Sequence, residues 1–225
     1  MTEQLSWKEI ILKGHRTFPH MPWAARGRWQ PSFSTFLILI GGLSLFGFGE
    51  GLLFIAHSGN SPWVVLSEGL SARTGLSVGV ITAIVSVLVL TLWIPLKEKP
   101  GLGTVMNIIV IATVLEVTID HLPAVTNQVA AIACDIAAVL AIGLGSAFYL
   151  TTKLGPGPRD GLMTSIHNRT GVRVSRVRLS IELTVLSMGW LLGGTVGIGT
   201  VLFAAGIGRA MAFWLGVLSR LAHQA

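Results

Sequence analysis

The stretch GNSPWVVLSEGLSARTG, from Gly59 to Gly75, has a counterpart 96 positions later, GPGPRDGLMTSIHNRTG, from Gly155 to Gly171. Each stretch begins with glycine, has a proline three residues further on, and ends in Arg-Thr-Gly. Proline is favoured in the first turn of a helix, and glycine just after its last residue. The pattern therefore predicts two short helices, Pro62–Thr74 and Pro158–Thr170.

The similarity between the two stretches extends well beyond them. With the same offset, 16 of the 59 positions between residues 47 and 105 are identical, where composition alone would give about five. The sequence therefore contains an internal repeat of two copies. Each copy contains three long apolar runs, and an odd number of spans reverses the second copy relative to the first.

Composition indicates that the solvent of this chain is lipid. Of the 225 residues, 52% are hydrophobic and only 12% are charged, whereas soluble domains carry about 25% charged residues. About 20 apolar residues suffice to span a bilayer, and six runs qualify: Phe33–Ala56, Leu76–Leu96, Gly101–Ile119, Val125–Thr151, Val172–Leu192 and Gly197–Ser219.

The predicted fold is an all-α membrane protein with six transmembrane helices, built as two inverted three-helix repeats. Each repeat has a short half-helix after its first span. The expected division is an N-terminal arm (1–32), repeat 1 (33–124), repeat 2 (125–220) and a C-terminal tail (221–225).

The distribution of lysine and arginine predicts the orientation. Of the 16 basic residues, 14 fall in the arm, the tail and the segments after the second and fourth runs. The opposite side has Arg73, and Arg209 lies within a run. Because cytoplasmic loops are enriched in basic residues, both termini and residues 153–178 are expected to be cytoplasmic, and residues 57–75 and 120–124 to face outward.

The position of the half-helices allows two interpretations. They could lie at the membrane interface as amphipathic connectors, or enter the membrane and aim their N-terminal amides at a shared site. The second half-helix contributes four candidate binding residues, which are Arg159, Asp160, Asn168 and Arg169. Arg159 either pairs with the neighbouring Asp160 or contacts a ligand.

Charged residues inside the apolar runs are the other candidates for a substrate or ion site, because such residues are costly in lipid. Glu50 and Asp135 are carboxylates suited to bind a proton or a cation. Arg209 suits a substrate or counter-ion role, with structural pairing to Asp135 or extension toward the membrane surface as alternatives. Asn107 either contributes to a site or bonds to another helix.

The sequence lacks the marks of several other function classes. It contains no HExxH, Walker or GxSxG motif, its histidines have no metal-ligand spacing, and Cys134 is its one cysteine. We therefore expect no catalytic residues, no metal, no cofactor and no enzymatic activity. No basic module of the kind that binds nucleic acid is present.

At its glycine-rich motifs the chain resembles the YczE/YitT group of bacterial membrane proteins, most closely the YczE branch. The resemblance rests on LGPGPRDGLM at 154–163, RTG at 169–171, PGLGTVMN at 100–107 and GIGTVL at 197–202. It implies a multi-pass protein of the bacterial inner membrane with unassigned biochemistry. Some relatives are linked to the production or export of antibiotics and other secondary metabolites.

Two functions remain in competition, with an intramembrane enzyme a more remote third. The inverted repeat and the buried charges favour a secondary transporter or exporter of an unidentified small molecule. The alternative is a non-transporting accessory protein that docks cytoplasmic partners on the basic segment 153–178. The expected partners are the lipid bilayer and an unknown small molecule, and homo-oligomerisation is left undecided.

Overall fold

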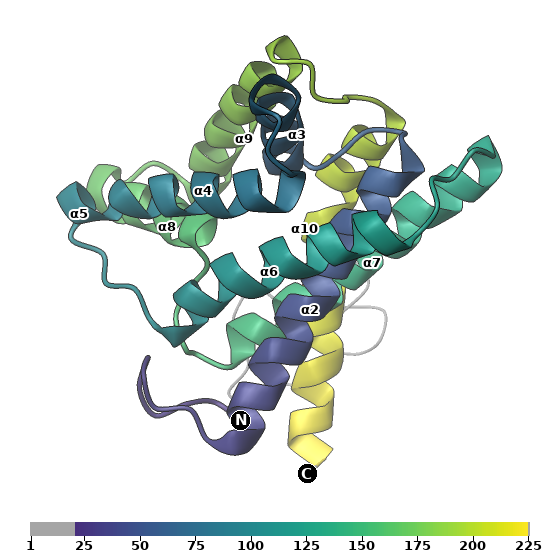
Figure 1. Ribbon diagram of the computed structural model, residues 1–225. Helices are drawn as coiled ribbons and strands as arrows, with labels where there is room; N and C mark the ends of the chain where they lie inside the picture. Colours follow the sequence, from purple (N-terminus) through teal and green to yellow (C-terminus); the bar gives the residue numbers. More distant parts are fainter. Residues whose placement is uncertain (1–20, 225) are drawn as a thin grey trace.

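The computed structural model describes residues 21–224, and within this range the chain folds into α-helices joined by loops, with no β-strand (Figure 1). The prediction of an all-α fold is confirmed for these residues. Residues 1–20 of the expected N-terminal arm lie outside the described range. The helices are α2 (Phe33–Ala56), α3 (Pro62–Thr74), α4 (Val78–Thr91), α5 (Trp93–Leu96), α6 (Leu102–His121), α7 (Gln128–Thr151), α8 (Pro158–Thr170), α9 (Val174–Leu191) and α10 (Ile198–Gln224).

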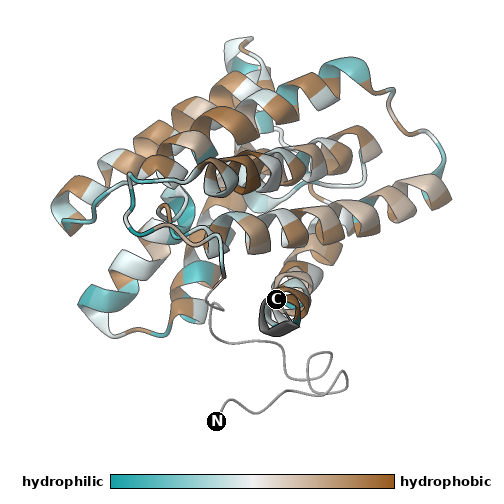
Figure 2. Ribbon diagram, turned by 90° about the horizontal axis from the view of Figure 1, so that it is seen from below, coloured by the Kyte–Doolittle hydropathy of each residue, from teal (hydrophilic) through white to brown (hydrophobic). Residues whose placement is uncertain are grey.

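Five helical stretches are long and apolar enough to cross a membrane: α2, α4 with α5, α6, α7 and α10. Apolar residues dominate the helices, and hydrophilic residues gather in the loops and at helix ends (Figure 2). Helix α9 occupies the predicted fifth run but is not one of the five, since its 18 residues include Arg176, Arg178 and Glu182. Helix α10 continues into the segment expected as a tail.

The two half-helices, α3 and α8, begin and end at the predicted residues. Each has proline in its first turn, and each is followed by a left-handed glycine, Gly75 with φ 74° and Gly171 with φ 69°. Other residues rarely adopt this conformation, so the glycines fix where the helices stop. Helix α3 packs mainly against α9 (Figure 1), and its first six residues are buried.

Helices α2 and α7 cross closely at the centre of the molecule, and glycines permit the approach. A methyl group on Gly49 would lie 2.6 Å from Cγ1 of Ile142, and one on Gly145 would lie 2.7 Å from the backbone nitrogen of Phe46. Each residue of the first contact has its counterpart 96 positions away in the second. The two helices therefore contact each other through equivalent residues of the two copies.

The loops that precede the half-helices also make equivalent contacts, each with a helix of the other copy. The N–H of Gly199, on α10, donates to the carbonyl of Ser58 at 3.0 Å, and the N–H of Gly103, on α6, donates to the carbonyl of Leu154 at 2.8 Å. Donors and acceptors are again 96 positions apart. Each loop thus rests on the last helix of the other copy, and this places both half-helices beside the central crossing.

Candidate functional site

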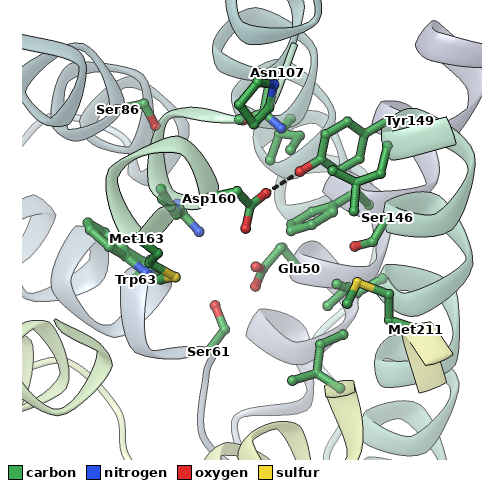
Figure 3. A pocket seen from close by; sticks show the side chains of 18 of the residues that line it. Glu50, Ser61, Trp63, Ser86, Asn107, Ser146, Tyr149, Asp160, Met163 and Met211 are labelled. Carbon is green, nitrogen blue, oxygen red and sulfur yellow. Dashed lines mark hydrogen bonds between the residues drawn. The ribbon is translucent and has the colours of Figure 1, made fainter. Parts of the chain in front are cut away.

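A central cavity of about 300 Å³ lies at the N-termini of both half-helices, beside the α2–α7 crossing (Figure 3). This volume is at the lower end of the range for small-molecule sites. The polar and charged residues that line it come from six helices and the loop before α3: Glu50, Ser61, Thr82, Ser86, Asn107, Ser146, Tyr149, Arg159, Asp160, Thr164, Arg178 and Glu182. Apolar side chains from α2, α6, α7 and α10 complete its wall.

The lining follows the internal repeat. Eight pairs of lining residues are 96 positions apart in the sequence, so both members occupy equivalent places in the two copies: Phe46 and Ile142, Glu50 and Ser146, Ser61 and Gly157, Trp63 and Arg159, Thr82 and Arg178, Ser86 and Glu182, Asn107 and Phe203, and Ile111 and Ile207. Both copies therefore contribute corresponding surfaces to the cavity, but with different side-chain chemistry.

Glu50 is the unusual acid of this site. It lies in the last third of α2 with 1% of its surface exposed, and neither carboxylate oxygen has a hydrogen-bond partner. The hydroxyls of Ser61 and Thr82, which also line the cavity, are likewise buried and make no hydrogen bond of normal geometry, although the Ser61 hydroxyl lies close enough to the Glu50 carboxylate to stabilise its charge. Ser61 occupies the N-cap position of α3, but its side chain makes no cap bond. Because unpaired buried polar groups cost free energy, these groups mark a place where a ligand would be stabilising.

Arg159 lies across the cavity on α8. Its guanidinium is 4.9 Å from the centroid of the Trp63 ring, within cation–π range. It also interacts electrostatically with Glu50 and Asp160. The local Arg159–Asp160 pair considered from the sequence is not formed as a hydrogen bond; Arg159 instead stacks on the other copy's tryptophan.

Asp160 accepts a short hydrogen bond from the hydroxyl of Tyr149, the one tyrosine of the chain (Figure 3). Tyr149 is buried on α7, whereas Asp160 is exposed at the start of α8. The bond therefore ties α8 to the central helix α7. On the opposite wall, Arg178 and Glu182 of α9 form an ion pair one helical turn apart, at 2.8 Å.

Four of the eight sequence-predicted site residues meet in the cavity: Glu50, Asn107, Arg159 and Asp160. Asn168 and Arg169 do not, because they lie exposed at the far end of α8. Arg209 is also exposed and donates to the carbonyl of Ala205 on its own helix. Asp135 is buried elsewhere and accepts a 2.6 Å hydrogen bond from Ser58, so the suggested pairing with Arg209 is absent.

Several lining residues were missed by reasoning from sequence. Tyr149, Trp63, Ser61 and Ser146 are uncharged and carry no intrinsic signal of function. The repeat itself held a usable clue, because Ser146 aligns with Glu50 and Trp63 with Arg159. Among the described residues, no cluster of three or more His, Cys, Asp or Glu side chains suited to a metal ion is found.

Apolar helices of spanning length around a cavity with charged walls define a multi-pass membrane protein. The chain belongs to the family of unknown function DUF6198, whose model matches residues 33–215. The predicted resemblance to the YczE branch is confirmed, since the chain is 33% identical to the uncharacterised membrane protein YczE of Bacillus subtilis, over 84% of this chain and 85% of that protein.

Two further relatives extend this comparison. An uncharacterised protein of Haemophilus influenzae is 42% identical over 92% of this chain and 95% of its own length. The uncharacterised protein YyaS of Bacillus subtilis is 26% identical over 72% of this chain and 82% of its own. The likeness thus covers most of the membrane region. No solved structure matches the chain.

Proposed function

We propose that the protein is a secondary transporter of a small molecule and that the central cavity is its binding site. The observation that carries this proposal is the buried carboxylate of Glu50, which accepts no hydrogen bond, in a cavity lined by equivalent residues of both repeat copies. Transporters built from inverted repeats bind their substrates at the repeat interface. An ionisable group within a membrane helix is costly unless it serves such a site.

The proposal includes six spans arranged as two inverted repeats, with α9 as the fifth span along the chain. The exchanged contacts of the α2–α7 crossing and of the two loops support a two-fold relation between the copies. The charges of α9 fit a membrane setting, because Arg178 and Glu182 pair and face the cavity. Arg176 lies in the first turn of the helix, where it reaches the membrane surface.

The topology that accompanies this proposal places the protein in the inner membrane with both termini cytoplasmic. It rests on the asymmetry of the basic residues. The start of α8 then belongs to the cytoplasmic side and the start of α3 to the outer side.

The two sides of the cavity differ in their packing. At the α8 side, Asp160 and Val174 are exposed. Their counterparts in the first copy, Val64 and Val78, are buried in one apolar cluster with Leu115. These differences support a conformation that is accessible from the cytoplasmic side and closed on the outer side.

A hydrogen bond holds the outer side closed. The N–H of Gly79, on α4, donates to Oε2 of Glu116, on α6, at 2.6 Å. The equivalent positions of the second copy are Ser175 and Ala212, which cannot form this bond, and α9 has no contact with α10 as extensive as that of α4 with α6. In a transport cycle, the outward-accessible state would exchange these roles, with α4 released from α6 and α9 packed on α10.

Labelling of single cysteines tests the proposal without knowledge of the substrate. In a Cys134→Ser background, Thr164→Cys should react with a membrane-impermeant reagent from the cytoplasmic side. Val64→Cys, buried here, should react from the outside whenever the transporter opens outward, and Glu116→Ala should accelerate that reaction. Val64→Cys that never reacts from outside, in wild-type or Glu116→Ala background, would rule out alternating access.

The accessory function is the second candidate, and one observation favours it. Arg169, Arg173 and Arg176 are exposed along the segment between α8 and α9, where they form a basic surface accessible to a cytoplasmic partner. If the accessory function is correct, the double variant Arg169→Ala with Arg173→Ala should abolish function. Val64→Cys should then never react with the reagent from outside. We propose in either case a non-enzymatic role.

A further inference from the structure

Asp135 forms a second buried polar site, separate from the central cavity. Its side chain has no exposed surface, and its Oδ1 atom has no hydrogen-bond partner. Its Oδ2 atom accepts a 2.6 Å hydrogen bond from the hydroxyl of Ser58, which belongs to the loop before α3. Asp135 is not among the residues that line the cavity.

Three oxygen atoms converge beside Gly199, at the start of α10. The carbonyl oxygen of Gly59, Oγ of Ser58 and Oδ1 of Asp135 all lie within 3.1 Å of the point where a methyl group on Gly199 would sit. Any side chain there would displace them. The absence of a side chain at Gly199 thus lets a carboxylate, a hydroxyl and a carbonyl gather closely against the start of α10, and this is the set of ligands that hard cations prefer.

The equivalent pair, with the roles of the two copies exchanged, shows that the fold does not require this polar contact. The counterparts of Asp135 and Ser58 are Leu39 and Leu154, which are both fully buried in one apolar cluster. Gly103, the counterpart of Gly199, makes the same loop contact beside them. Two leucines therefore fill the equivalent place without any polar group, although a buried carboxylate without a cation is costly.

We propose that Asp135, Ser58 and the carbonyl of Gly59 bind a small monovalent cation, either a sodium ion or a proton. The bound cation neutralises the carboxylate and joins α7, the α2–α3 loop and the start of α10. The titratable groups nearby are Cys134, on α7, and His57, which precedes Ser58. The thiol of Cys134 contacts the carbonyl of Leu52 on α2, and α10 contributes Gly199, so no charged side chain of these elements competes for the site.

Thermal unfolding of the purified full chain in detergent tests the site independently of any transport. The midpoint is measured in sodium chloride and in choline chloride at equal ionic strength, and then in choline chloride at acidic and at alkaline pH. For a bound sodium ion, a hundredfold excess over Kd should raise the midpoint by about 5 °C or more. A proton site instead predicts stabilisation by acid with no sodium effect.

Four variants assign the effect to this site. Asp135→Asn should lose the shift for either cation, Ser58→Ala should lose a sodium-dependent shift but keep an acid-dependent one, and Glu50→Gln, in the cavity, should retain both. The double variant Ser58→Leu with Asp135→Leu installs the arrangement of the other copy, and should fold and unfold at a midpoint independent of sodium and of acid. The proposal is overturned if neither cation shifts the wild-type midpoint, if the shift survives in Asp135→Asn and in the double variant, or if Glu50→Gln alone removes it.

Discussion

The guanidinium of Arg159 lies 4.9 Å from the ring centroid of Trp63, and the two residues occupy equivalent positions in the two copies of the repeat. The contact joins the first turns of α3 and α8 across the cavity. One copy supplies a cation and the other the aromatic surface that holds it. The site therefore depends on chemical differences between copies that share one backbone plan.

Replacement of Arg159 tests the planar guanidinium. Arg159→Ala should lower function strongly with a modest loss of stability. Arg159→Lys should restore little, because an ammonium group lacks the flat, forked geometry that stacks on Trp63 and bonds an anionic group in two places. Uptake and the unfolding midpoint are measured for both variants. A lysine variant with wild-type uptake would show that charge alone is required.

An exchange of charges distinguishes contact of Arg159 with a ligand from a structural ion pair between Arg159 and Asp160. Because Asp160 is bonded to Tyr149 rather than to Arg159, the double variant Arg159→Asp with Asp160→Arg should remain inactive. Recovery of uptake in this variant would favour a structural ion pair between the two residues.

Tyr149→Phe removes the hydroxyl that donates to Asp160 and leaves the ring in place. Hydrogen bonds to charged groups contribute about 1.5–3 kcal/mol, and the exposed position of Asp160 reduces this toward the lower value. We expect a small fall in the unfolding midpoint but a clear loss of function, since α8 is no longer tied to α7. Thr184→Ala, on an exposed part of α9 and outside the cavity, likewise removes a hydroxyl that makes one hydrogen bond and is the control. Equal function in Tyr149→Phe and wild type would contradict this role.

Gly145→Ala tests the central crossing. The added methyl group would meet backbone atoms of Gly42 and Phe46, which cannot move aside as a side chain end could. Overpacking of this kind costs about 1–3 kcal/mol, so the unfolding midpoint should fall. Gly41→Ala is the control, because a methyl group there meets nothing within 4 Å. Similar midpoints for both variants would mean that the α2–α7 approach is looser than described.

The sequence predicted the helices better than it predicted which charges meet. The boundaries of α3 and α8 follow from proline and glycine, whose effects are local. The convergence of side chains is not local: Arg169 lies about 15 Å along α8 from Arg159, so only the first two turns reach the cavity. Arg209 lies outside the cavity, exposed on α10 and bonded to its own helix, and its charge alone did not indicate which side of the helix it occupies.

Asp135 shows the same limit in another way. Its burial was predicted, but its partner was sought in the charged Arg209 rather than in Ser58. Ser58 lies in a loop of the other copy, 77 positions away, and only the tertiary exchange between copies brings the two together. A comparison of the copies with each other, residue by residue, gives information that neither provides alone.

Flux into proteoliposomes tests the central claim most directly. Wild-type protein and Glu50→Gln are reconstituted in parallel, and a panel of radiolabelled small molecules is screened with and without a pH gradient. We predict that at least one compound accumulates in wild-type vesicles, and that Glu50→Gln, folded and equally incorporated, reduces its uptake to the level of protein-free vesicles. Uptake of that compound by Glu50→Gln at the wild-type rate, or wild-type vesicles equal to protein-free vesicles for the whole panel, would contradict the account.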